Sequence, residues 1–159
     1  MADAILTSLV YIERDDKYLL LHRTKRENDV NRGKWIGVGG KFERDESPEE
    51  CAIRETREET GLTLLCPVYR GIVTFVNDRC PTEYMHLFTC SEFTGTPGEC
   101  DEGELAWIEK SRVPSLPLWE GDRIFLALLS EGAPFFSLKL VYTGDTLVRA
   151  ILDGRTLPL

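Results

Sequence analysis

The chain has 159 residues, enough for one sizeable hydrophobic core and short for two, so we expect a single domain over residues 1–159. Its 27 acidic residues outnumber 19 basic ones, and the net charge of −8 argues against a protein that binds a nucleic-acid polymer through a basic face. No stretch approaches the length of a membrane span and no signal-like segment opens the sequence, so we expect a cytoplasmic protein that does not enter a membrane. The five cysteines lack a C-x-x-C pair, which favours neither a disulfide framework nor a zinc site.

The N-terminal part of the chain has the pattern of a β-hairpin. Residues 4–12 are apolar and β-rich, and the charged turn 13–17 separates them from the apolar run 18–21. A loop with several basic residues follows; it is either a solubilising surface or a rim that faces phosphates. Residues 35–40, Trp-Ile-Gly-Val-Gly-Gly, then predict a short strand that ends in a glycine turn.

Residues 48–60 have the signals of an α-helix. Ser47, Pro48 and Glu50 form the pattern of a capping box with proline in the first turn. Gly61 stands where a left-handed residue commonly ends a helix. The sequence therefore predicts a helix of about thirteen residues.

The predicted helix places acidic side chains on one face. At 100° per residue, Glu55 and Glu59 share that face and Glu58 lies at its edge. Like charges four residues apart repel, so a cation between them would stabilise the helix. Carboxylates and the carbonyls of the glycine turn are hard oxygen ligands, which suit Mg²⁺ or Mn²⁺. The same pattern is also consistent with a solvated acidic helix surface.

The remainder of the chain is predicted to be mostly strands with one further helix. β-branched and aromatic residues predict a second hairpin before residue 95, and an acidic segment that contains Glu102 precedes a strand with Trp107. The predicted strands are 62–76 and 83–93 about the turn 77–81, and 135–142 and 146–151 about the turn 143–145; the predicted helix is 123–130.

The stretch around the first helix resembles the Nudix family, whose motif is G-x5-E-x7-R-E-U-x-E-E-x-G-U, where U is a bulky apolar residue. Thr56 is the one departure. The resemblance implies a Nudix α/β/α sandwich with a mixed curved sheet, and Mg²⁺ (or Mn²⁺)-dependent cleavage of a diphosphate linkage in a small nucleotide. The matching residues are Gly40, Glu46, Arg54, Glu55, Glu58, Glu59, Gly61 and Leu62.

The resemblance also implies roles for individual residues. Glu55, Glu58 and Glu59 would bind the metal together with Gly39, Arg54 would orient the glutamates by ion pairing, and Glu46 would hold Arg54 from the loop. Glu102 is a candidate further ligand or the general base that takes a proton from water. Without the motif, the acidic segment around Glu102 would be interpreted as a hydrophilic loop.

Within the family, the segments after residue 95 resemble the oxidised-purine nucleoside triphosphate diphosphatases and the bacterial MutT-type enzymes. The resemblance implies that Trp119 stacks on a purine and that Asp122 hydrogen-bonds its edge. Trp119 is also consistent with an ordinary core aromatic. Arg23 and Lys41 would contact phosphates. The candidate substrate-binding residues are Ser8, Arg23, Gly37, Gly40, Lys41, Trp119 and Asp122.

Two residues depart from the oxidised-purine pattern. Ile36 replaces an asparagine and Gly121 replaces an aspartate, so two hydrogen-bonding groups of the base pocket are lost. The hypothesis is attack of water on a nucleoside triphosphate such as 8-oxo-dGTP, which releases the monophosphate and pyrophosphate. The alternatives are a diphosphatase for an ordinary nucleotide, a dinucleoside polyphosphate or a nucleotide sugar, and a Nudix module that only senses nucleotides. Both a monomer and a homodimer remain open.

Overall fold

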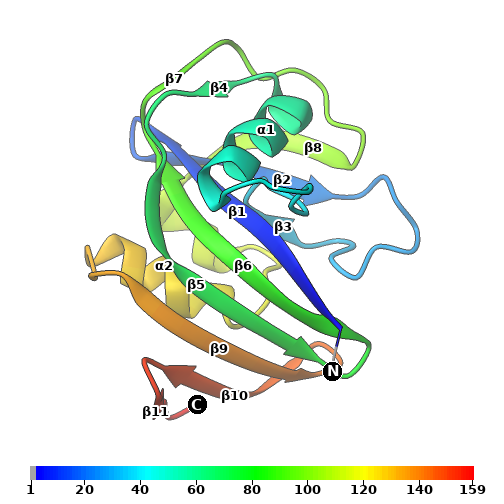
Figure 1. Cartoon of the computed structure of the whole chain (residues 1–159), viewed down its shortest axis with the longest axis vertical. Helices are drawn as coiled ribbons and strands as arrows, with labels where there is room; N and C mark the ends of the chain where they lie inside the picture. Colours follow the sequence, from blue (N-terminus) through cyan, green and yellow to red (C-terminus); the bar gives the residue numbers. More distant parts are fainter. Residues whose placement is uncertain (1–2) are drawn as a thin grey trace.

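A computed structural model describes residues 3–159 as a large, twisted, mixed sheet with a helix against each face (Figure 1). The main sheet has the order β11-β10-β9-β5-β6-β1-β2-β3, and β8 also pairs with β2. Two pairings, β1 with β6 and β5 with β9, are parallel, and the others are antiparallel. The strands are β1 (Ala4–Arg14), β2 (Lys17–Arg23), β3 (Trp35–Ile36), β4 (Thr63–Leu64), β5 (Val68–Asn77), β6 (Cys80–Cys90), β7 (Phe93–Thr94), β8 (Gly103–Glu109), β9 (Phe136–Thr143), β10 (Thr146–Leu152) and β11 (Arg155–Thr156); the helices are α1 (Pro48–Thr60), α2 (Asp122–Ser130) and the 3-10 helix η1 (Lys110–Ser115).

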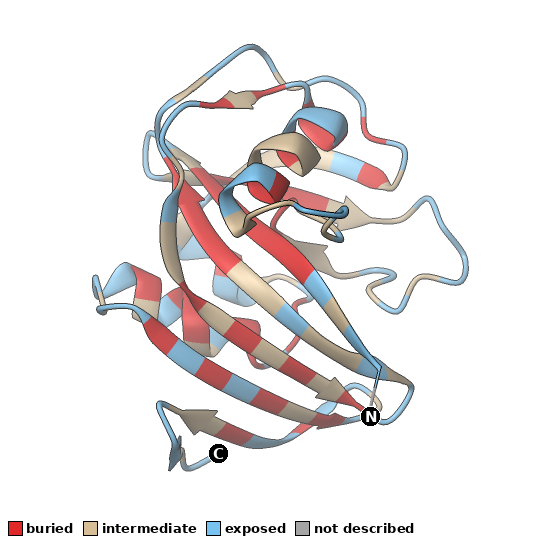
Figure 2. Cartoon of the chain, in the orientation of Figure 1, coloured by how far each residue is buried: buried red, intermediate tan, exposed pale blue. Residues whose placement is uncertain are grey.

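The alternation of side chains along the strands divides the core into two clusters. On β1, Val10 and Ile12 pack toward α1, whereas Leu9 and Tyr11 pack toward α2. Buried and exposed residues also alternate along β9, where the outer face of the sheet meets solvent (Figure 2). The predicted α/β/α sandwich with a mixed sheet is therefore confirmed.

Helix α1 begins and ends where its capping signals predicted. Ser47 Oγ accepts a hydrogen bond from the Glu50 amide, and Glu50 accepts one from the Ser47 amide. Gly61 ends the helix at φ 81°, a conformation that a side chain would disfavour. Local hydrogen bonds thus fix the segment that carries the acidic face.

The second predicted hairpin differs in detail from the observed one. The predicted strand 62–76 is interrupted between β4 and β5 at Pro67, which lacks the amide hydrogen that a continuous strand would use. The predicted turn 77–81 is wrong because Asn77 pairs directly with Cys80, leaving only Asp78 and Arg79 in the loop. Pro81 is accommodated at a register shift between the strands.

The glycine turn after β3 runs along β1 instead of forming a longer strand. Val10 and Val38 exchange both backbone hydrogen bonds, and the Ser8 amide donates to the Gly40 carbonyl at 2.9 Å. A Cβ at Gly39 would collide with the Ser8 carbonyl, and its φ of 151° also favours glycine. The turn therefore lies unusually close to the sheet. Among residues 3–159, no helix has the length and apolarity needed to cross a bilayer.

Candidate active site

Arg54 is the hub of an ion-pair network that fixes the acidic face of α1. Its guanidinium binds both carboxylate oxygens of Glu46, with N–O distances of 2.6 and 2.9 Å. It also contacts Glu55 at 2.8 Å and Glu58 at 3.1 Å, and it donates to the Lys41 carbonyl. The hydrogen bond to Arg54 lowers the pKa of Glu46, and the same contact raises the pKa of Arg54. Arg54 thus joins the helix to the glycine turn.

Glu59 points from α1 to the glycine turn. Its Oε1 accepts a hydrogen bond from the Gly39 amide at 3.0 Å, while its Oε2 is buried and has no hydrogen-bond partner in the described chain. Burial raises the pKa of Glu59 to about 8, and the negative charges of Glu102 and Glu55 act in the same direction. A buried carboxylate oxygen without a partner is costly, so this oxygen is suited to a ligand.

The residues around Glu59 fit a hard divalent cation in the chemistry of their donors. They present carboxylate oxygens, and Glu59 Oε2 supplies a buried oxygen that no protein group satisfies. Gly40 leaves the space that the Glu55 carboxylate fills, since a Cβ there would collide with it. Within residues 3–159, no three Asp, Glu, His or Cys side chains are grouped closely enough to hold a metal. Glu55 and Glu58 are both paired with Arg54. Metal binding by these residues stays a prediction.

Glu102 reaches the same region from the loop before β8. It is paired with Arg23 at 3.2 Å and with Arg26 at 3.5 Å, and its charge influences Glu59. Arg23 is held on its other side by Asp29 at 2.6 Å. Arg23, which was predicted to contact phosphates, is therefore a largely buried cation beside the acidic cluster.

A cavity of about 120 Å³ lies on the α2 side of the sheet and reaches the glycine turn. Its lining includes the predicted metal-site residue Gly39. It also includes five predicted substrate-binding residues: Arg23, Gly37, Gly40, Trp119 and Asp122. The predicted Ser8 also lines it, but the Ser8 hydroxyl accepts a hydrogen bond from the Cys51 thiol of α1. The predicted Lys41 does not line it and is exposed next to Arg54.

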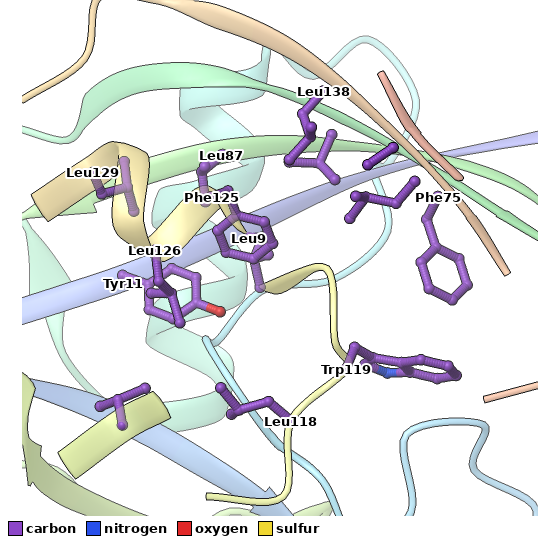
Figure 3. Close-up of a cluster of buried hydrophobic side chains, with 14 of the residues drawn as sticks. Leu9, Tyr11, Phe75, Leu87, Leu118, Trp119, Phe125, Leu126, Leu129 and Leu138 are labelled. Atoms are coloured by element: carbon purple, nitrogen blue, oxygen red, sulfur yellow. The ribbon is translucent and has the colours of Figure 1, made fainter. Parts of the chain in front are cut away.

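Trp119 forms one wall of the cavity at the end of a hydrophobic cluster (Figure 3). Its ring packs edge-on against Phe75 and Tyr142, and its Nε1 donates to Asn31 Oδ1 at 2.8 Å. The Lys34 ammonium lies 4.2 Å from the centre of the indole ring. Trp119 is only 3% exposed, so it is at once a core aromatic and a pocket wall.

Asp122 is the first residue of α2 and faces the cavity from a buried position. Burial raises its pKa to about 8, although the positive charges of Arg123 and Lys34 oppose the shift. At neutral pH this carboxyl is mostly protonated and can donate a hydrogen bond. The predicted start of the helix at Arg123 is one residue late.

Sequence reasoning missed several residues that line the cavity. Asn31 was seen only as part of a polar loop, and Phe75 and Glu83 only as strand residues. Glu83 accepts a hydrogen bond from Thr7, which is 76 residues away in the sequence. Phe75 and Glu83 share a signal, an isolated aromatic or polar residue on the inner face of a strand, that becomes readable only when the pairing of β1, β5 and β6 is known.

Comparison with known proteins identifies relatives along most of the chain. Residues 5–129 match the NUDIX domain. The uncharacterized Nudix hydrolase YvcI of Bacillus subtilis is 34% identical over 84% of each chain, and the oxidized purine nucleoside triphosphate hydrolase of Danio rerio is 29% identical over 93% of this chain and 94% of its own. The crystal structure of a MutT protein from Bacillus halodurans superposes with a TM-score of 0.83 at 28% identity, over 94% of this chain and 97% of the other.

Proposed function

Because the chain belongs to the Nudix family, we propose that it hydrolyses a purine nucleoside triphosphate, an oxidised one such as 8-oxo-dGTP, to the monophosphate and pyrophosphate. The names of the relatives support this reaction, since one of them is an oxidized purine nucleoside triphosphate hydrolase with similar length. The proposed cofactor is Mg²⁺ (or Mn²⁺), and the proposed partner is the small-molecule nucleotide alone.

The observation that carries the proposal is the shared wall between the cavity and the glutamate site. Gly39 lines the cavity and also donates its amide hydrogen to Glu59. A nucleotide whose base lies beside Trp119 and Asp122 would direct its phosphates past Gly39 toward the acidic cluster. One ligand of nucleotide size would therefore connect the two halves of the site.

The acidic residues would bind the cofactor, and the basic residues would orient the phosphates. A divalent cation held by Glu55, Glu58 and Glu59 would neutralise phosphate charge and lower the pKa of a water molecule. Glu102 is the candidate for a further ligand or for the general base. Arg23 lies close enough to the cavity to pair with a phosphate in place of its carboxylate partners.

Arg54 would act without touching the substrate. Its contacts with Glu46 hold it against the loop, and its contacts with Glu55 and Glu58 hold those carboxylates in one orientation. Such outer partners of metal ligands orient the donor oxygens. Lys41 is exposed beside this network and would contact a phosphate from outside the cavity.

A second candidate substrate is a nucleotide with an ordinary base. Ile36 brings an apolar side chain to the cavity, and Gly121 brings none. At Gly121 a Cβ would collide with Leu140 and lie 2.7 Å from the Tyr142 hydroxyl, so the observed packing excludes an aspartate there. All the motif glutamates are present, which favours catalysis over nucleotide sensing.

The test is pyrophosphate release with Mg²⁺ or Mn²⁺ from 8-oxo-dGTP, dGTP, dATP, CTP and a dinucleoside polyphosphate. We expect the highest kcat/KM for 8-oxo-dGTP. We also expect Glu59→Gln to lower turnover by about 100-fold or more, with Glu49→Gln on the exposed side of α1 as the matched control. A flat substrate profile would refute the oxidised-purine role, and tight nucleotide binding without hydrolysis would favour the sensing alternative.

A further inference from the structure

Glu83 brings an acidic side chain to the part of the cavity where the base is proposed to lie. On the paired strands β5 and β6, Glu83 stands directly opposite Phe75, so both side chains project from the same face of the sheet. Phe75 packs edge-on against Trp119, with 5.1 Å between ring centres. Glu83 and Phe75 both line the cavity. The Glu83 side chain therefore leaves the sheet beside Phe75, which in turn contacts Trp119.

The environment of Glu83 leaves one of its oxygens for a ligand. Oε2 accepts a hydrogen bond from Thr7 Oγ1 at 2.7 Å, which fixes the orientation of the carboxyl group. Oε1 has no hydrogen-bond donor among residues 3–159, and it is not one of the buried polar atoms that lack a partner, so it is accessible from the cavity or from solvent. Burial raises the pKa of Glu83, while Thr7, Lys41 and Arg23 oppose that shift. A carboxyl group that Thr7 holds on one side and that lines the cavity can accept a further hydrogen bond with its other oxygen.

The other polar groups of the pocket make an acceptor from Glu83 useful. Asp122 is mostly protonated at neutral pH and can donate a hydrogen bond. The Asn31 carbonyl oxygen is already used by Trp119. Neither Ile36 nor Gly121 offers a polar side chain. Glu83 Oε1 is thus an acceptor that the pocket can offer to a base beside Trp119.

We propose that Glu83 determines base specificity by accepting a hydrogen bond from an N–H group on the edge of the bound purine, with Thr7 as its positioning residue. This inference rests on the proposed function, since it concerns the same pocket. An amino or ring N–H of a purine edge lies beside a ring nitrogen or carbonyl acceptor. Glu83 as acceptor and Asp122 as donor, which line the same cavity, would complement such an edge in chemistry.

The first test compares kcat and KM of the full-length wild type and Glu83→Gln across the nucleotide panel. Glutamine keeps the size of the side chain but removes the charge and one acceptor oxygen. Hydrogen bonds to charged groups are the stronger ones, so we expect kcat/KM for the preferred purine to fall about 10- to 100-fold. The fall in kcat/KM would come mainly from a higher KM. The ratio of kcat/KM for the preferred purine to that for the other nucleotides would become smaller. Glu104→Gln, an exposed change on β8, is the matched control.

The second test measures the positioning role of Thr7. Thr7→Val keeps the shape of the side chain and removes the donor to Glu83, and Thr7→Ser restores a hydroxyl. We expect the valine variant to narrow base preference in the same direction as Glu83→Gln and the serine variant to recover it. A merely structural role would lower the melting temperature and change kcat/KM for all nucleotides by the same factor.

Equilibrium binding of nucleoside monophosphates separates this inference from the proposed function. If the wild type hydrolyses no nucleotide but Glu83→Gln changes the order of monophosphate affinities, the reaction is wrong and the role of Glu83 stands. If hydrolysis occurs and Glu83→Gln leaves the base order unchanged, only the role of Glu83 is overturned. A change confined to the ratio of ribo- to deoxyribonucleotides would mean that Glu83 contacts the sugar, which also overturns base reading. Absence of both binding and hydrolysis overturns both proposals.

Discussion

Replacing Asp122 with asparagine is expected to make the protein more resistant to unfolding at alkaline pH. Asp122 is 6% exposed, and burial raises its pKa from 3.8 to about 8. At any pH between these two values, Asp122 therefore keeps its proton in the folded protein and releases it in the unfolded chain. Stability consequently falls as the pH rises through this window and levels off above about pH 8. Asparagine has nearly the same shape and no proton to lose.

The size of the effect follows from the width of the window. Each pH unit between the two pKa values removes about 1.4 kcal/mol from the free energy of unfolding. Between pH 5 and pH 9, ionisation of Asp122 is therefore expected to cost the wild type on the order of 4 kcal/mol relative to Asp122→Asn. In a domain of this length, that corresponds to a difference in melting temperature of roughly 10 °C.

Urea unfolding of the wild type and Asp122→Asn at pH 5, 7 and 9 measures this difference. Glu59 has a pKa raised to about 8 by burial and contributes a pH dependence of the same sign. Glu59→Gln is therefore the control, because it removes the contribution of Glu59 to the pH dependence of stability and leaves the contribution of Asp122 intact. If the gap between wild type and Asp122→Asn stays within about 0.5 kcal/mol from pH 5 to pH 9, Asp122 ionises normally and the reasoning fails.

Three further outcomes are expected. Arg54→Lys keeps the charge but loses the bidentate contact with Glu46. We expect kcat/KM to fall about 10- to 100-fold and the Mg²⁺ concentration needed for activity to rise, which a metal titration measures. An unchanged Mg²⁺ requirement would contradict the orienting role of Arg54. Gly121→Ala places a Cβ against Leu140, and we expect it to lower the free energy of unfolding by about 1–3 kcal/mol in urea unfolding. Gly98→Ala is the control, because a Cβ there would make only an ordinary contact at 3.9 Å. Equal effects of the two substitutions would refute the packing argument. Chelation with EDTA is expected to abolish pyrophosphate release, and Mg²⁺ or Mn²⁺ to restore it; release that persists after complete chelation would exclude the metal.

Local signals explain why helix α1 could be predicted to the residue. Ser47, Glu50 and Gly61 act through hydrogen bonds within a few positions of themselves, so the sequence contains all the information needed to place both ends. The contact between Arg54 and Glu46 is also local, at eight residues. The family motif is therefore both a sequence pattern and a compact structural unit.

The pocket could be predicted only in part because its walls come from distant segments. Trp119 is linked to Asn31 across 88 residues, and Glu83 is linked to Thr7 across 76. Neither partner carries a local signal for the other. The resemblance to the family supplied Trp119 and Asp122, but it contained no reason to expect an acidic residue at position 83. That residue becomes visible only through the parallel pairing of β1 with β6.

The alternation of side chains along β1 explains how one strand serves both halves of the site. Ser8 faces α1, where it contacts Cys51 beneath the glycine turn, whereas Thr7 lies one position earlier on the opposite face and orients Glu83. The Gly39 amide reaches Glu59 from a turn that lies directly on β1. One face of β1 therefore contributes Thr7 to the cavity side of the sheet, while the other contributes Ser8 to the packing against α1.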